Sequence, residues 1–258
     1  MMNLLRRIVA VMLLPVLGQT LANAQEQFTG NVEADVVSQY VWRGLEKGGF
    51  SIQPKASLSW QGLSLMFMGS TGFRSTDAKE INLGLQYSRW GFNIGVTDYW
   101  VTGIEENDLY FHYEKKGAHQ LEGNIGFTCD YFKLQAYTFF WGNDFKTNGK
   151  QAYSTYIELG VPFQIGGIDW LVTAGMTPFE SAGTSYIKQA LSDRGNVVQL
   201  EKADYTYAEG PSCVLASLRA TKKLDIGFAQ IPVFAEFNAN PYLQKAYMIF
   251  GVTITPFQ

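Results

Sequence analysis

The sequence predicts an all-β protein, a closed antiparallel transmembrane β-barrel of about twelve strands that follows a cleaved signal peptide. The first observation behind this prediction is alternation. Even positions from 50 to 60 are apolar, whereas odd positions from 51 to 59 are polar. Successive side chains of a strand point to opposite faces, so this strand has one apolar and one polar face. The second observation is length, because a strand of about 9–11 residues is what a tilted bilayer crossing needs.

The N-terminal segment 1–24 reads as a secretory signal peptide. It begins with Arg6 and Arg7, continues with an apolar run over 8–17, and ends in the small residues Ala22 and Ala24. The apolar run is too short for a spanning helix. We therefore expect one outer-membrane β-barrel domain over 25–258.

Composition excludes several classes of protein. Loss of the two signal-peptide arginines lowers the formal net charge from −3 to about −5. A nucleic-acid-binding protein would instead carry an excess of basic residues. The chain lacks a long apolar run outside the signal, so a helical membrane protein is excluded. We place Cys129 and Cys213 on non-adjacent strands and opposite faces, and therefore expect two free thiols.

The same alternation, taken along the chain, marks the strands in order. Each apolar parity should face lipid, and each polar parity should face the lumen. Short turns with residues such as Gln61-Gly62, Trp90-Gly91 and Asp130-Tyr131 should lie at the inner end, and longer loops at the outer end. The expected strands cover 31–42, 50–60, 63–73, 80–88, 92–100, 121–128, 132–141, 153–161, 170–177, 213–221, 229–238 and 245–257. An even number places both termini on the periplasmic side, and the first strand must pair with the last because an open edge is unsatisfied in hydrocarbon.

Two outer segments are less regular than the strands. Segment 101–118 is expected to be a long outer loop, although the alternation of Leu109, Phe111 and Tyr113 also fits a short hairpin. Segment 178–211 is the largest irregular stretch, and loops of this length are usually functional or disordered. Thr184 or Ser185 could cap a short helix over 186–191 there.

The tryptophans all fall at ends of expected strands. Amphipathic rings at both ends of the strands are typical of the two girdles at membrane interfaces. The predicted girdle residues are Trp42, Trp100 and Trp141 at the outer end, and Trp60, Trp90 and Trp170 at the inner end.

Charged side chains occupy the polar parity, since charge facing lipid is costly. The predicted lumen-lining residues are Glu33, Asp35, Arg43, Lys55, Glu80, Glu122, Lys133, Glu158, Arg219 and Glu236. Twelve strands lie between a filled barrel and an open pore. A water-filled channel and a closed barrel, either structural or partner-binding, therefore both remain open.

No catalytic residues are predicted. The only histidines are His112 and His119, without a nucleophile motif beside them. We expect no enzyme activity, no metal site and no cofactor.

The run Ser38-Gln39-Tyr40-Val41-Trp42-Arg43-Gly44 resembles the end of the first strand in TorF-type porins, small outer-membrane proteins of Gram-negative bacteria. Runs 80–83 and 95–100 are also similar, and the aromatic richness and the second half of the chain look similar to members from Bacteroides-like bacteria. The resemblance implies an outer-membrane barrel and a pore, and it transfers no catalytic residue. Phe257 is similar to the terminal aromatic read by the barrel-assembly machinery.

We therefore expect passive diffusion of small hydrophilic solutes through the barrel, with a closed structural or partner-binding barrel as the alternative. The expected partners are outer-membrane lipid, the assembly machinery during biogenesis and small hydrophilic solutes, with no nucleic acid. Other partners are not indicated by the sequence.

Overall fold

The computed structural model describes residues 28–74, 77, 79–102, 109–191, 197–227 and 229–255, with the backbone alone over 186–203. The expected signal peptide 1–24 and the terminal Phe257 lie outside these residues. No helix in the described part of the chain is long and apolar enough to span a membrane.

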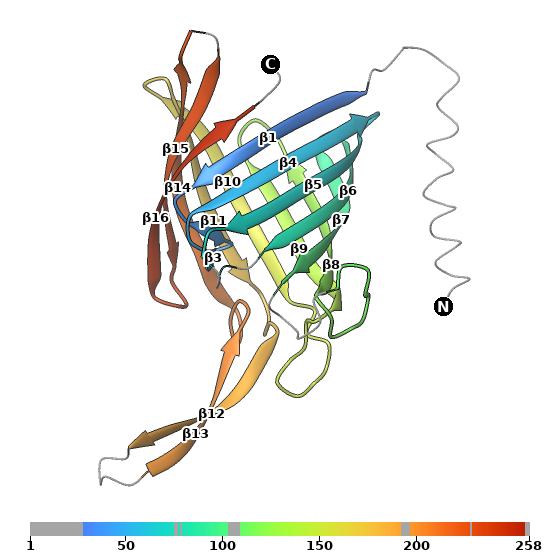
Figure 1. Ribbon diagram of the computed structural model, residues 1–258, viewed down its shortest axis with the longest axis vertical. Coiled ribbons are helices and arrows are strands. Elements are labelled where there is room, and N and C mark those ends of the chain that lie inside the picture. The colour runs from blue at the N-terminus through green and yellow to red at the C-terminus, as the bar shows by residue number, and fades with distance from the viewer. Residues whose placement is uncertain are drawn as a thin grey trace, which may run out of the picture.

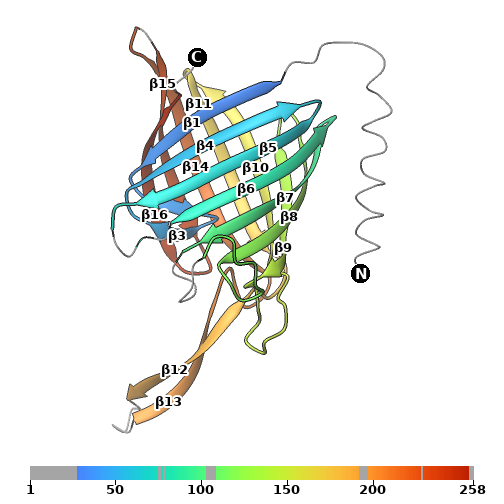
Figure 2. The same ribbon diagram turned by 45° about the vertical axis from the view of Figure 1, so that its right-hand side comes forward.

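Twelve antiparallel strands form a closed barrel, as the sequence predicts (Figures 1 and 2). Each strand pairs with its neighbours in chain order, and β1 closes the wall by pairing with both β4 and β16. The wall strands are β1 (Thr29–Val37), β4 (Ser51–Trp60), β5 (Leu63–Gly72), β6 (Glu80–Arg89), β7 (Phe92–Val101), β8 (His119–Thr128), β9 (Lys133–Gly142), β10 (Thr155–Ile165), β11 (Ile168–Thr177), β14 (Ser212–Asp225), β15 (Gln230–Asn240) and β16 (Lys245–Ile254).

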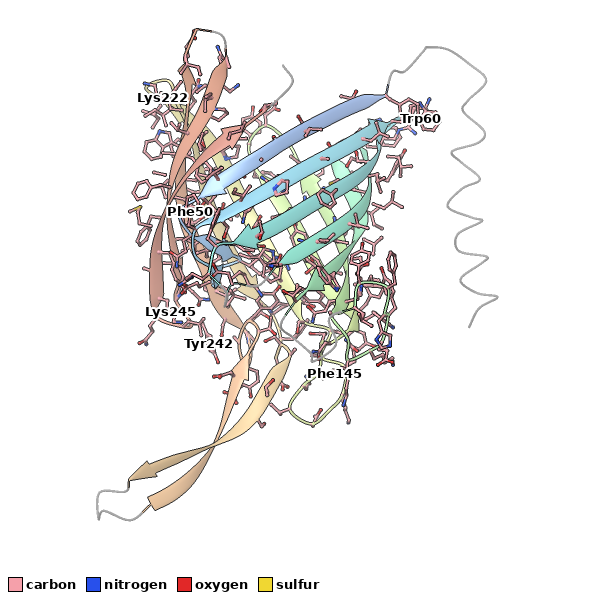
Figure 3. The ribbon with its side chains drawn as sticks, in the orientation of Figure 1. Phe50, Trp60, Phe145, Lys222, Tyr242 and Lys245 are labelled. Carbon is pink, nitrogen blue, oxygen red and sulfur yellow. The ribbon has the colours of Figure 1, made fainter. Side chains whose placement is uncertain are left out.

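The tight turns gather at one end of the barrel, which is also the end where β1 begins and β16 finishes (Figure 1). Gln61 and Gly62 have φ angles of 49° and 83°, and Trp90 and Gly91 have 53° and 83°. Two successive positive φ angles are typical of the type I′ turn, whose twist matches that of the flanking strands. Figure 3 places Trp60 and Lys222 at this end, and Tyr242, Lys245 and Phe145 toward the opposite end.

The outer face of the wall is apolar. Leu58 pairs with Leu65, Leu65 with Leu85, and Leu85 with Val96, so these side chains form a row across four neighbouring strands. All four are exposed on the outside of the barrel. The polar parity faces inward and is largely buried, as at Gln53, Asn82, Asn93, Gln135 and Asn238. The predicted orientation of the two parities is therefore confirmed.

In the part of the chain that the structure describes, two hairpins lie outside the wall, and both correct the sequence prediction. The first wall strand ends at Val37 rather than at 42, because the chain bends at Ser38 and forms a separate hairpin of β2 (Tyr40–Trp42) and β3 (Leu45–Gly48). Arg43 and Gly44, with φ angles of 51° and 78°, form its turn.

The second hairpin, β12 (Gly183–Leu191) with β13 (Val197–Tyr205), projects from the barrel end opposite the tight turns (Figure 1). The expected short helix over 186–191 is wrong. Nine residue pairs from Gly183–Tyr205 to Leu191–Val197 hold this segment in an antiparallel ladder. Cross-strand pairing thus overrides the local helix-capping signal.

Two further predictions, a loop over 101–118 and two free thiols, can be compared with the structure, whereas Cys129 lies just after β8 and not on a strand as expected. Residues 109–118 form turns and contain no strand, which confirms a loop over that part of 101–118. Cys129 and Cys213 are both free thiols.

Candidate functional site

The β2–β3 hairpin is bound to side chains and backbone from several strands of the barrel. The hydroxyl of Tyr40 donates to Glu80 on β6 at 3.0 Å, and Asn240 on β15 donates to the carbonyl oxygen of Gly44 at 3.2 Å. A side chain at Gly44 would collide with the carbonyl oxygen of Val214 on β14, and its φ of 78° also favours glycine. These contacts hold the turn of the hairpin against the strands β6, β14 and β15.

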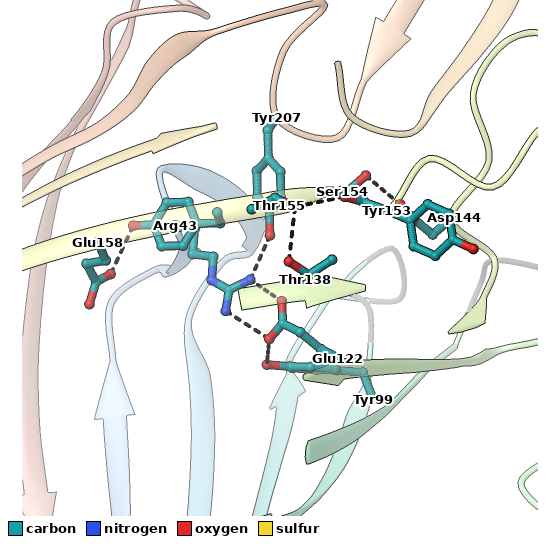
Figure 4. Close-up of polar contacts among 11 residues, drawn as sticks. Arg43, Tyr99, Glu122, Thr138, Asp144, Tyr153, Ser154, Thr155, Glu158 and Tyr207 are labelled. Atoms are coloured by element: carbon teal, nitrogen blue, oxygen red, sulfur yellow. Dashed lines mark hydrogen bonds and ion pairs between the residues drawn. The ribbon is translucent and has the colours of Figure 1, made fainter. Parts of the chain in front are cut away.

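Arg43, at the turn of this hairpin, forms a buried ion pair with Glu122 of β8 (Figure 4). The guanidinium donates to the two carboxylate oxygens at 2.5 and 2.9 Å, and to the hydroxyl of Tyr207 at 2.7 Å. The side chains of Arg43 and Glu122 are only 7% and 2% exposed. A two-point Arg–carboxylate pair is among the strongest charge-assisted hydrogen bonds, and it fixes geometry as well as charge.

Aromatic rings also contact the guanidinium of Arg43. Its central carbon lies 4.4 Å from the ring centre of Trp42, 4.2 Å from that of Tyr137 and 4.7 Å from that of Tyr156. A cation within about 6 Å of an aromatic face is attracted by the ring quadrupole, and more strongly where water is excluded. Arg43 is therefore held by one carboxylate, one phenol and three rings.

The groups around Arg43 are themselves oriented by hydrogen bonds that do not involve it. Tyr99 donates to Glu122 at 2.9 Å, and Tyr156 donates to Glu158 at 2.9 Å. The backbone N–H of Tyr207 donates to the hydroxyl of Ser181 at 2.9 Å. We call Glu122, Tyr99, Tyr137, Tyr156 and Tyr207 the guanidinium box.

The other predicted lumen-lining charges form separate groups. Lys55 binds Asp35 at 2.6 Å and lies 3.6 Å from Glu33. Arg219 lies 3.7 Å from Glu236. Lys133, at the start of β9, is exposed and joins neither group. Of the ten predicted residues, Arg43, Glu122 and Glu158 meet at the guanidinium box, and Glu80 holds the hairpin beside it.

Several inward polar side chains each leave one atom without a hydrogen-bond partner among the described residues. They are buried to nine-tenths or more, and belong to different strands of the wall. The atoms are Gln53 Nε2, Ser70 Oγ, Asn82 Oδ1, Gln135 Nε2 and Asn238 Oδ1. Buried polar groups are normally satisfied by protein or by ordered water. Neighbouring side chains close these five atoms off from solvent, so this part of the interior is tightly filled.

One tryptophan prediction is wrong. The ring of Trp42 contacts Tyr99, Tyr207 and Arg43 instead of lying on the outer surface, because its hairpin turns inward. The other five lie at or next to strand ends: Trp60, Trp90 and Trp170 at the end with the tight turns, Trp100 and Trp141 at the opposite end. A position at a membrane interface stays a prediction for these five.

Sequence reasoning missed a second polar cluster, on the outer face of the wall. Asp98 pairs in register with the outward-facing Leu83 and with Leu121, yet its carboxylate binds His119 and Tyr113. A signal was present, because Asp98 interrupts an apolar parity that contains Phe92, Ile94, Val96 and Trp100. No group of three or more potential metal ligands lies together among the described residues.

Fold and site together define a closed β-barrel protein whose interior is narrowed by its own β2–β3 hairpin. No protein-family model matches the sequence, and no curated protein matches it significantly. The resemblance to TorF-type porins therefore stays a prediction.

Proposed function

We propose that this protein is an outer-membrane channel for passive diffusion of small hydrophilic solutes, narrowed by the β2–β3 hairpin. Two surfaces support the proposal. The exposed apolar row of Leu58, Leu65, Leu85 and Val96 suits lipid contact, and the inward orientation of the polar parity suits a polar lumen. No turnover chemistry is involved.

Inward-facing charges that stay open to solvent carry the proposal. The side chains of Lys55, Glu33 and Arg219 are on the inward parity, yet they are 34%, 29% and 32% exposed. A barrel filled by its own side chains would close such charges off from water, which is costly. A hydrated interior with charged walls is what a solute channel requires.

The arrangement of charge supports a narrow and mildly selective passage. The ten predicted lumen residues are six acids and four bases, and oppositely charged groups across a narrow lumen select solutes by size and charge. The surplus of acids favours cations, and added salt weakens this preference by screening.

The topology suits a bacterial outer membrane with both termini in the periplasm. β1 begins and β16 finishes beside the tight turns, whereas the β12–β13 hairpin projects from the other end (Figure 2). Short turns on the periplasmic side and longer outer loops are the pattern of such barrels. The proposed partners are outer-membrane lipid, the barrel-assembly machinery during biogenesis and the diffusing solutes.

The rival function is a closed barrel, structural or partner-binding. It is favoured by the tight packing around Arg43 and by the projecting β12–β13 hairpin, which could present a docking surface. A partner would then contact this hairpin, and the lumen would pass no solute.

Planar-bilayer recording of the purified, refolded chain separates the two functions. We expect discrete conductance steps, and Glu158→Lys should shift ion selectivity toward anions. The control is Glu180→Lys, which makes the same charge change in the loop between β11 and β12. Glu180 pairs with Lys146 there, and its replacement should leave ion selectivity nearly unchanged. A silent bilayer from folded, heat-modifiable protein, including an Arg43→Met variant with a released hairpin, would exclude the channel.

A further inference from the structure

The guanidinium box and the cation that fills it belong to different elements of the protein. Glu122, Tyr99, Tyr137 and Tyr156 are on wall strands β8, β7, β9 and β10. Arg43 is at the turn of the β2–β3 hairpin, which contacts the wall through the hydrogen bonds described above and through the apolar side chains of Val41 and Leu45. The receptor groups and the cation that they bind are therefore on separate elements of the chain.

The chemistry of the box is that of a receptor for organic cations. One carboxylate binds the planar fork of the guanidinium through both oxygens, the hydroxyl of Tyr207 accepts a further bond, and the faces of Tyr137 and Tyr156 cover it. Carboxylates and aromatic faces are the groups that recognise guanidinium and alkylammonium ions. Tyr99 and Tyr156 donate hydrogen bonds of their own to Glu122 and Glu158, which orient both phenols toward the box.

Outward movement of the hairpin without a replacement cation is unfavourable. It would leave Glu122 buried and without its cation, with Glu158 nearby adding like charge. A buried charge that loses its partner is strongly destabilising. A solute cation in the box would remove that penalty, so binding of the solute and release of the hairpin are thermodynamically linked.

We propose that the guanidinium box is a binding site for solutes that carry a guanidinium or primary ammonium group. Arg43 is its tethered internal occupant. A solute of this class competes with Arg43, takes its place on Glu122 and favours the released hairpin. If the barrel conducts as proposed, such cations promote their own passage, and that part of the inference rests on the proposed function. Binding of the cation to the box does not require conduction.

Calorimetric titration with methylguanidinium chloride tests the site, with methylurea as the neutral probe of the same shape. The variants are Arg43→Met, which keeps an unbranched stem but no charge, and Arg43→Lys, which keeps the charge but loses the fork. We expect affinity for methylguanidinium to rise from wild type to Arg43→Lys to Arg43→Met, by about tenfold or more overall. Methylurea should bind at least about tenfold more weakly than methylguanidinium to Arg43→Met, a difference of about 1.4 kcal/mol.

Glu122→Gln in the Arg43→Met background should abolish the preference for the cation. Equal affinity for the two probes, or equal affinity for methylguanidinium in all three proteins, would overturn the proposal. If Arg43→Met does not refold, the comparison of Arg43→Lys with wild type decides the question.

Bilayer recording distinguishes failure of this inference from failure of the proposed function. Selective methylguanidinium binding to a protein that never conducts would retain the site and exclude the channel. Conduction by a protein that binds both probes equally would retain the channel and exclude the site.

Discussion

Asp98 on β7 and His119 on β8 form a hydrogen-bonded pair on the outer face of the barrel wall, with 2.9 Å between Oδ1 and Nδ1. His119 is fully buried although its strand position faces outward. The loop residues Tyr110 and Tyr113 cover it: the carbonyl oxygen of Tyr110 lies 2.5 Å from Nε2, and the ring of Tyr113 stacks at 3.9 Å. The pair thus anchors segment 109–118 to the wall.

His119→Ala should release this segment. Loss of the imidazole removes the partner of Asp98 and the ring on which Tyr113 stacks. This should lower the free energy of opening of segment 109–118 by about 1–3 kcal/mol. Trypsin cleavage at Lys115 and Lys116 should accelerate by about tenfold or more, because proteolysis follows the population of the open segment.

His112→Ala is the control for this experiment. His112 contacts the exposed Glu114 in the same segment, and its loss should change cleavage little. Equal acceleration by both substitutions would contradict an anchor at His119.

Alkaline pH should weaken the same anchor. Burial, and then the hydrogen bond that Tyr113 donates to Asp98, raise the pKa of Tyr113 from 10.0 to about 12. A raised pKa means that this contribution to stability is intact below pH 10.0 and is lost as the pH rises through about 12. The difference in tyrosinate absorbance between wild type and Tyr113→Phe should show one group that titrates near pH 12. A midpoint near 10 would contradict the hydrogen bond.

Gly175→Ala, on the wall strand β11, should displace Tyr156 and so disturb the guanidinium box. A Cβ at Gly175 would overlap the ring and hydroxyl of Tyr156, which packs on Arg43. Displacement of this ring should lower the free energy of unfolding by about 1–3 kcal/mol, measured by urea titration in detergent.

Gly160→Ala is the matched control on β10, the strand that carries Tyr156. Its Cβ would meet only ordinary contacts, 3.4 Å from Leu171 and 4.0 Å from the next atoms. We expect a change below about 0.5 kcal/mol. The same loss at both glycines would show that overlap with Tyr156 is not the cause.

Asp35→Asn should weaken the seam where β1 closes the barrel. Asp35 binds Lys55 of β4 at 2.6 Å and accepts a hydrogen bond from Thr253 of β16 at 2.7 Å, so one carboxylate joins three strands. In a double-mutant cycle with Lys55→Met we expect a coupling energy of about 0.5–2 kcal/mol, discounted because Lys55 is 34% exposed.

The pair of Lys146 and Glu180, at 2.9 Å and about equally open to solvent on both sides, is the reference for this cycle. Its coupling should be smaller, about 0–1 kcal/mol. A coupling at Asp35 no larger than the reference would mean that its ion pair does not stabilise the seam.

The closed barrel could be predicted from local features of the chain. Alternation assigns each side chain of a strand to one of two faces, and a one-residue slip would reverse every assignment, so the pattern over 50–60 fixes which face is apolar. Turn residues such as Gln61 and Gly62 fix where strands reverse. These are local properties, and the strand number, the faces and the tight turns could therefore be predicted.

The residues that meet at the site could not be predicted, because their contacts join distant parts of the chain. Arg43 follows a strand that alternates regularly, and nothing local shows that its chain turns inward to meet Glu122, 79 positions away. The inward position of Trp42 follows from the same turn. The β12–β13 hairpin replaced an expected helix because its stability comes from pairing with a second strand, from Leu191–Val197 to Gly183–Tyr205, which the pattern within 186–191 does not show. Asp98 and His119 likewise became a pair only when β7 and β8 aligned, since contacts between strands depend on register and not on the pattern within either strand.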